Sequence, residues 1–166
     1  MVFPPSATVL EIGCAEADWI TPMLAERPDL RITGIDWRRA ERPCGVIKGD
    51  VLTYDLAPES FDVVVGISSI EHVGLGHYDG DPLDEFGDQH CMERVLRWLK
   101  SGGWVYFDVP YGDVYKVSGT AHREYDYLTL RERLLPRGLV SQHSWVIRPA
   151  SPGGMAYIAV HATKES

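Results

Sequence analysis

Four short apolar runs in the first part of the chain each stop at glycine or at polar side chains. The runs are rich in β-branched and aliphatic residues, which predicts β-strands. The fourth run is almost wholly apolar, as is typical of a strand covered on both faces in a parallel sheet, and we expect it to be the central strand. The four predicted strands span residues 8–12, 32–35, 46–47 and 62–68.

Helical patterns separate and follow these runs. Thr21 is expected to cap a short helix that has Pro22 at its first position. A longer helix is predicted to begin at Asp88, because apolar residues then recur at the i, i+3, i+4, i+7 spacing of a one-sided stripe. Gly102 and Gly103 are predicted to end this helix. The stripe consists of Met92, Val95, Leu96 and Leu99.

The last part of the chain predicts a strand at 104–109, a short helix near 128–135 and a hairpin of two strands at 140–147 and 155–162. Strands that alternate with helices and end in a hairpin indicate an α/β fold, with a mostly parallel sheet and one reversed strand. The length of 166 residues fits one domain and is too short for two.

Composition narrows the function classes. With 16 Lys and Arg against 24 Asp and Glu, the net charge of −8 disfavours a surface that tracks nucleic-acid phosphates. The three cysteines form no CxxC pair, so neither a disulfide framework nor a thiolate zinc site is expected, and a reducing cytoplasm is the expected location. The start lacks a basic region followed by an apolar run, and no segment is apolar enough to span a membrane. Neither secretion nor membrane insertion is expected.

The ends of the predicted strands are where chemistry is expected, because open parallel sheets bind ligands beyond the carboxyl ends of their strands. Asp36 follows the second predicted strand, where a carboxylate can accept both hydroxyls of a ribose; the alternative is a helix cap or a solvated loop residue. The turn after the first strand lacks a GxGxxG pattern, since Ala15 and Ala17 stand where glycines would let a pyrophosphate approach. A dinucleotide is therefore disfavoured.

Six segments together resemble the class I S-adenosylmethionine (SAM)-dependent methyltransferases, and they extend over essentially the whole chain. The resemblance implies a single domain over 1–166 with a three-layer Rossmann-like fold. Its sheet would be seven-stranded and mostly parallel, with an antiparallel C-terminal strand. The segments are VLEIGCAEA at 9–17, GID at 34–36, GDV at 49–51, FDVVV at 61–65, IEHV at 70–73 and LKSGG at 99–103.

The same resemblance implies how SAM would be held. The loop under its methionine part would be formed around Glu11, Gly13, Cys14 and Ala15, and Asp36 would accept the ribose hydroxyls. We interpret Cys14 as a small buried residue and not as a nucleophile.

The adenine and the sulfonium would lie at the next two strand ends. Trp37 would rest against the adenine, while Asp50 and Val51 would hold it, with the acid accepting from the exocyclic amine. Backbone around Ile67 and Ser68 would face the sulfonium.

The family usually has helices before the first strand that roof the active site, whereas about seven residues precede that strand here. We expect the glycine-containing acidic insert at 73–87 to act as the lid, with another subunit of a homo-oligomer as the alternative. The acids near the insert, with His72, His77 and His90, also fit a metal site. The simpler interpretation is a solvated acidic loop, and we expect no metal.

Methyl transfer from a sulfonium is an in-line displacement, in which an enzyme supplies alignment and, for a hydroxyl acceptor, a general base. His72 is the first candidate base, with Glu71 as its orienter, and the alternative for His72 is a hydrogen-bonding residue at a helix start. His122 is the second candidate base.

Residues after the fifth predicted strand are expected in the acceptor pocket. Tyr111 follows that strand directly, and Arg123 and Tyr125 are close to His122 in sequence. Arg123 and Tyr125 would bind an anionic or hydroxylated acceptor, unless their cluster lies on the surface.

The leading hypothesis is an enzyme that moves a methyl group from SAM to an oxygen or nitrogen of a small acceptor, either sugar-like or otherwise polar. The alternative is a catalytically inactive relative that senses the cofactor or binds a partner. A nicotinamide-dependent enzyme is disfavoured by Ala15 and Ala17, and a nucleic-acid substrate lacks a basic stripe with interleaved aromatic residues.

Overall fold

The computed structural model describes residues 2–38, 40–78, 80–149, 151 and 154–166. Its strands are β1 (Thr8–Ile12), β2 (Arg31–Asp36), β3 (Gly45–Lys48), β4 (Phe61–Ile67), β5 (Leu99–Tyr111), β6 (Lys116–Ser118), β7 (His122–Glu124), β8 (Leu139–Ile147) and β9 (Ala156–Lys164). Its helices are α1 (Ile20–Glu26), α2 (Gly87–Trp98) and α3 (Tyr127–Leu134), with 3₁₀ turns η1 (Cys14–Glu16) and η2 (Ile70–His72). Among the described residues, no helix has the length and apolar character that a membrane crossing requires.

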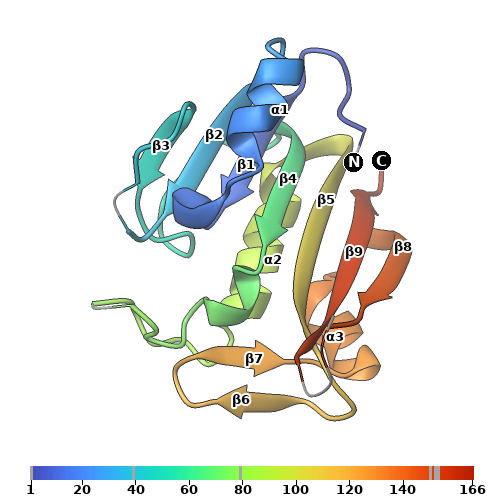
Figure 1. The fold of residues 1–166 in the computed structure, drawn as a ribbon. Helices are drawn as coiled ribbons and strands as arrows, with labels where there is room; N and C mark the ends of the chain where they lie inside the picture. The colour runs from blue at the N-terminus through green and yellow to red at the C-terminus, as the bar shows by residue number, and fades with distance from the viewer. Residues whose placement is uncertain (1, 39, 79, 150, 152–153) are drawn as a thin grey trace.

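The described strands form a seven-stranded sheet in the order β3-β2-β1-β4-β5-β9-β8, and β6 and β7 form a separate hairpin (Figure 1). Neighbours from β3 to β5 are parallel, while β9 runs antiparallel to both β5 and β8. This confirms the predicted α/β fold, with its mostly parallel sheet and reversed C-terminal strand.

Helices cover both faces of this sheet, with α1 on one face and α2 and α3 on the other (Figure 1). Alternate side chains of β4 enter the two layers, because successive residues of a strand point to opposite faces. Val63 and Val65 pack in the same cluster as Ile20 of α1, whereas Val64 packs in the same cluster as Met92 of α2. The prediction that this run is a central, doubly covered strand is confirmed.

Several element boundaries differ from the predicted ones. Helix α1 has Trp19 at its N-cap, so Thr21 lies inside the helix and is not its cap. Asp88 also lies inside a helix, one residue after the start of α2 at Gly87. Leu99, expected as the last residue of the apolar stripe, is the first residue of β5, so the helix ends before the two glycines.

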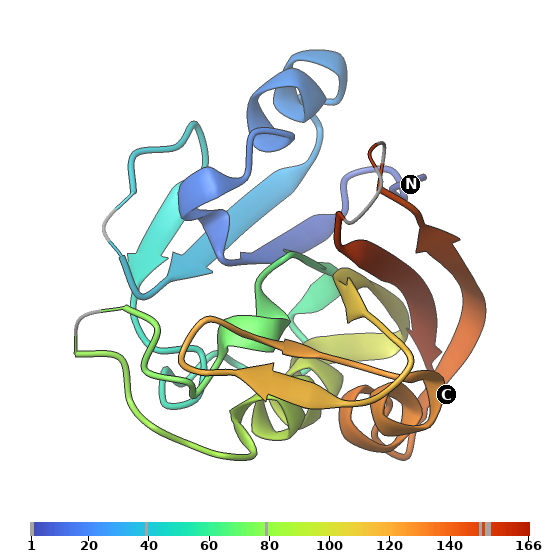
Figure 2. The same cartoon turned by 60° about the horizontal axis from the view of Figure 1, so that its bottom comes forward.

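The β6–β7 hairpin, which the sequence did not predict, lies across the carboxyl-terminal end of the sheet beside η2 and the loop that follows it (Figure 2). Arg123 of β7 is 1% exposed and donates to backbone carbonyls on both sides of this loop. The acceptors are the carbonyl oxygens of Glu71 and Val73 before the loop and of Asp84 and Glu85 after it. The hairpin therefore fixes both ends of the insert.

Asp88 is the buried anion of this region. Its carboxylate accepts two hydrogen bonds from Arg133, at 2.6 and 2.8 Å, and one from the Tyr125 hydroxyl at 2.8 Å. The Nε atom of Arg123 lies 3.6 Å from the same carboxylate. One side chain of α2 thus connects that helix to α3 and to the hairpin.

We expect Asp88→Ala to lower the free energy of unfolding by about 3–5 kcal/mol, because it leaves Arg123 buried without a carboxylate. Urea denaturation followed by circular dichroism measures the change. The matched control is Asp55→Ala, since the Asp55–Arg97 ion pair is exposed and such pairs contribute less than about 1 kcal/mol. Equal losses in the two variants would contradict this role of Asp88.

Candidate functional site

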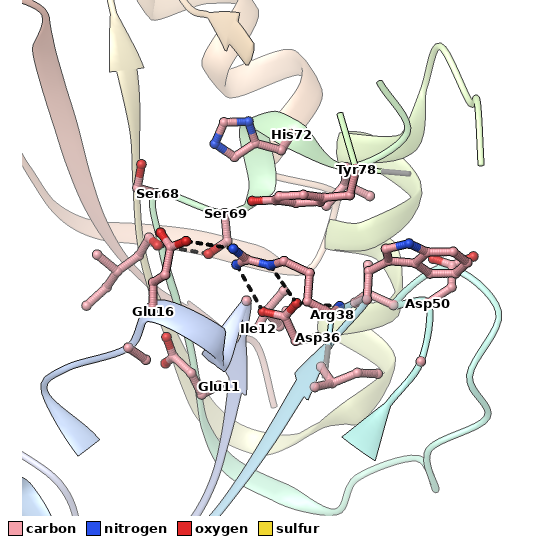
Figure 3. Close-up of a pocket in the computed structure, with 18 of the residues that line it drawn as sticks. Glu11, Ile12, Glu16, Asp36, Arg38, Asp50, Ser68, Ser69, His72 and Tyr78 are labelled. Atoms are coloured by element: carbon pink, nitrogen blue, oxygen red, sulfur yellow. Dashed lines mark hydrogen bonds and ion pairs between the residues drawn. The ribbon is translucent and has the colours of Figure 1, made fainter. Parts of the chain in front are cut away.

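A cavity of about 450 Å³ opens at the carboxyl ends of β1, β2, β3 and β4. Its volume is in the range of sites that bind small molecules and cofactors. The turn after β1, the ends of β2 and β4, and the loop after η2 surround it (Figure 3). This is the edge of the sheet where the sequence predicted the chemistry to lie.

Gly13 sets the shape of the turn after β1. Its φ of +80° lies in the left-handed region, and a Cβ atom there would sit 2.3 Å from the Ser69 hydroxyl oxygen. Its amide donates to the carbonyl oxygen of Ile35 at 2.9 Å, so the turn is fixed against the end of β2. A side chain at position 13 would push into the segment after β4.

Asp36 lies at the end of β2 with its carboxylate beside this turn (Figure 3). One carboxylate oxygen accepts the amide of Ala15, and the other accepts the amide of Arg38, both at 2.8 Å. The Arg38 side chain also contacts both oxygens, at 3.2 and 3.4 Å. Asp36 is 5% exposed, so these bonds fix a carboxylate at the wall of the cavity.

Asp50 lies across the cavity from the glycine turn, beyond the end of β3. Its side chain accepts the amide of Leu52 at 2.8 Å, which folds residues 50–52 into a turn of the type that Asp favours. Asp50 and Val51 both line the cavity, as does Trp37. The second and third strand ends therefore face one space.

Ser68 follows β4 in an unusual conformation that two carboxyl groups stabilise. Its φ is +46°, its amide donates to Asp108 at 2.8 Å, and its hydroxyl donates to Glu71 at 2.9 Å. Strained backbone of this kind is common at functional sites. Burial raises the pKa of Asp108 and raises that of Glu71 to about 7, so both carboxyls hold protons more tightly than exposed ones.

His72 lines the cavity beyond Ser68. Its Nδ1 atom bonds to the carbonyl oxygen of Ala121, which can only accept, so Nδ1 carries the ring proton of the neutral imidazole. Its Nε2 atom then has a lone pair and lies 3.7 Å from a carboxyl oxygen of Glu71. Burial lowers the pKa of His72, which keeps the ring neutral at pH 7.

The insert contributes to the cavity wall through Val73, Tyr78 and Asp81, and residue 79 lies outside the described residues. His77 bonds to the carbonyl oxygen of Thr120 at 3.1 Å, next to the carbonyl that holds His72. The insert thus contacts the tip of the β6–β7 hairpin.

Most of the residues predicted to hold the cofactor come together around this cavity. Cys14 and Ala15 do not line it. The buried Cys14 side chain packs against Gly34, and the carbonyl oxygens of Cys14 and Ala15 accept hydrogen bonds from Arg42. The predicted residues that line it are Glu11, Gly13, Asp36, Trp37, Asp50, Val51, Ile67, Ser68 and His72.

The expected acceptor residues lie elsewhere. Arg123 and Tyr125 are buried, and their polar groups are bound by the insert carbonyls and by Asp88, so both have structural roles in place of the expected contact with an acceptor. Tyr111 packs against the main apolar cluster, and His122 pairs with β6. None of these four residues lines the cavity.

Arg38 and Tyr78 are among the cavity residues that were not predicted from the sequence. Arg38 and Tyr78 lie against each other, with the guanidinium carbon 4.4 Å from the ring centroid (Figure 3). Arg38 is two residues after Asp36 in the chain, and this proximity was the available signal. Among the residues that the structure describes, no group of three or more His, Cys, Asp and Glu is arranged to hold a metal.

Solved structures with the same fold include enzymes of different activities. The 1,6-didemethyltoxoflavin-N1-methyltransferase of Burkholderia thailandensis, solved with S-adenosylhomocysteine (SAH), has a TM-score of 0.75 and 18% identity, over 96% of this chain and 72% of that one. The N-methyltransferase NodS of Bradyrhizobium japonicum WM9 has a TM-score of 0.71 and 18% identity, over 98% and 88%. The [4+2]-cyclase SpnF has a TM-score of 0.77 and 15% identity, over 99% and 78%.

No curated protein matches the chain in sequence. One family matches residues 49–142, from the end of β3 into β8. The protein therefore has the fold of the class I SAM-dependent methyltransferases, and it belongs to the family described as "Caenorhabditis protein of unknown function, DUF268".

Proposed function

We propose that the protein binds SAM in this cavity and transfers its methyl group to an oxygen or nitrogen of a small polar acceptor, of which a sugar-like molecule is one example. The observation that carries the proposal is the order of groups along the cavity. A fixed carboxylate at Asp36, a polar turn at Asp50 and a neutral imidazole at His72 follow one another around one space.

The donor set fits SAM. Asp36 would accept the ribose hydroxyls, and Asp50 and Val51 would hold the adenine. One carboxyl oxygen of Glu11 is buried without a hydrogen-bond partner among the described residues, and Glu11 lines the cavity. Burial raises the pKa of Glu11, and a cationic group beside it would stabilise the charged carboxylate.

When bound, SAM supplies a methyl group on a sulfonium that a nucleophile displaces in line. His72 would take the proton from the acceptor at Nε2, since Nδ1 is bound to a carbonyl. Glu71, at 3.7 Å, would stabilise the imidazolium that forms. Val73 and Tyr78 of the insert would exclude water from the acceptor, which supports the proposed role of the insert as a lid.

We expect Asp36→Ala to weaken binding of SAH by about 2 kcal/mol, roughly thirtyfold, because two ribose hydroxyls lose their acceptor. Isothermal titration calorimetry with SAH measures the change. Asp55→Ala removes an equal charge from an exposed site and should leave the affinity unchanged. If Asp36→Ala binds as tightly as the unmodified protein, Asp36 is not the ribose ligand.

We expect His72 to titrate below 6.5, its ordinary pKa, and to be neutral with its proton on Nδ1 at pH 7. Because a base must be unprotonated, SAH formation from SAM and a panel of small amines and polyols should fall as the pH drops through this pKa. Long-range ¹H–¹⁵N spectra of histidine-labelled protein report the tautomer and the titration, with His72→Gln identifying the signal.

His72→Gln should also reduce turnover far more than it reduces SAH affinity, and it should remove the acid limb of the pH profile. An unchanged turnover in this variant would assign the reaction to alignment without a base. A proton on Nε2 would contradict the proposed role of that atom.

A further inference from the structure

Arg38 extends its side chain into the corner of the cavity where the ribose would bind (Figure 3). Its guanidinium contacts three segments that are distant from one another in sequence. It pairs with Asp36 at the end of β2, with Glu16 of η1 at 2.6 Å, and with the ring of Tyr78 from the insert. The side chain therefore closes one corner of the site.

The Arg38 side chain occupies hydrogen-bond acceptors of the Asp36 carboxylate. Each of its two carboxylate oxygens accepts one backbone amide and one nitrogen of the Arg38 guanidinium. The two amides form the turn and the strand end themselves, so they stay in place when a ligand enters. The guanidinium is the mobile partner, and its bonds use the acceptor capacity that two ribose hydroxyls require.

We propose that Arg38 competes with the ribose for Asp36, so that SAM binds only when this side chain moves away. The inference rests on the proposed function and adds a residue that limits the affinity for the cofactor. Arg38 has a partner to keep when it moves, because the Glu16 side chain is 80% exposed and lies at the mouth of the corner. The guanidinium can rotate outward with Glu16 and remain paired.

The movement also affects the insert. Tyr78 lies on the guanidinium, an arrangement that attracts the cation to the face of the ring. Release of Arg38 removes that contact from the insert. Cofactor entry would therefore free Tyr78 before the acceptor arrives.

The test is whether substitution of Arg38 raises or lowers the affinity for SAH. Most substitutions in a binding cavity weaken binding, whereas Arg38→Ala should tighten SAH binding by roughly three- to fivefold, the effect expected for removal of a partly exposed ion pair that competes with the ligand. SAH is the suitable probe because its sulfur is neutral, which limits the effect of a changed protein charge. Arg38→Gln keeps much of the bulk without the charge and should tighten binding in the same direction.

Two matched variants test whether tighter SAH binding comes from the loss of the Arg38–Asp36 contact. Arg31→Ala removes the same charge from the exposed start of β2 and should leave the affinity unchanged. In an Asp36→Ala background, Arg38→Ala should change the affinity by less than about twofold, because the shared carboxylate is gone.

Weaker SAH binding by both Arg38 variants would overturn the inference and make Arg38 a ligand of the cofactor. Unchanged binding would also overturn it. In either case the proposed function would stand, because SAH still binds. If neither the unmodified protein nor any variant binds SAM or SAH, it is the proposed function that fails.

Discussion

The burial of β4 on both faces is the constraint on which the rest of this structure depends. Side chains of β4 from Val63 to Val65 enter the layer under α1 and the layer under α2, so the middle of the strand offers no lateral surface for polar groups. Polar side chains that follow such strands are restricted to the strand ends, and parallel strands bring those ends to one edge. The cavity and the carboxylates of Asp36 and Asp50 are all found at that edge. The chemistry of the molecule is thus located by the packing of its apolar residues.

The strand ends also decide which parts of the site could be predicted from the sequence. Asp36 and Ser68 were identifiable because each lies at the end of a strand that an apolar run of residues reveals. Arg123 and Tyr125 were misassigned because β6 and β7 are three residues long and have no apolar alternation to mark them. Without the hairpin, nothing in the sequence places Arg123 against backbone carbonyls or Tyr125 against Asp88. These are long-range contacts, and local patterns carry no information about them.

The fold does not determine the activity, which depends on the individual residues of the cavity. Two N-methyltransferases and a [4+2]-cyclase share it with TM-scores above 0.7 and identities of 18% or less. Function in such a fold depends on the site and not on the architecture. In this chain the polar groups at or beside the cavity include the Nε2 lone pair of His72, the Glu71 carboxyl with its raised pKa, and the guanidinium of Arg38. The family match begins at residue 49, so His72 and Glu71 lie within it, whereas Asp36 and Arg38 precede it.

Arg123 holds both ends of the insert in place, so the length of the insert has little effect on the stability of the sheet. Carbonyls at positions 71 and 73 and at positions 84 and 85 are tied to one guanidinium, so the span between them is closed as a ring whatever it contains. Lengthening a closed loop adds little entropic cost. The sequence of this cavity-lining segment can therefore change while the sheet around it stays the same.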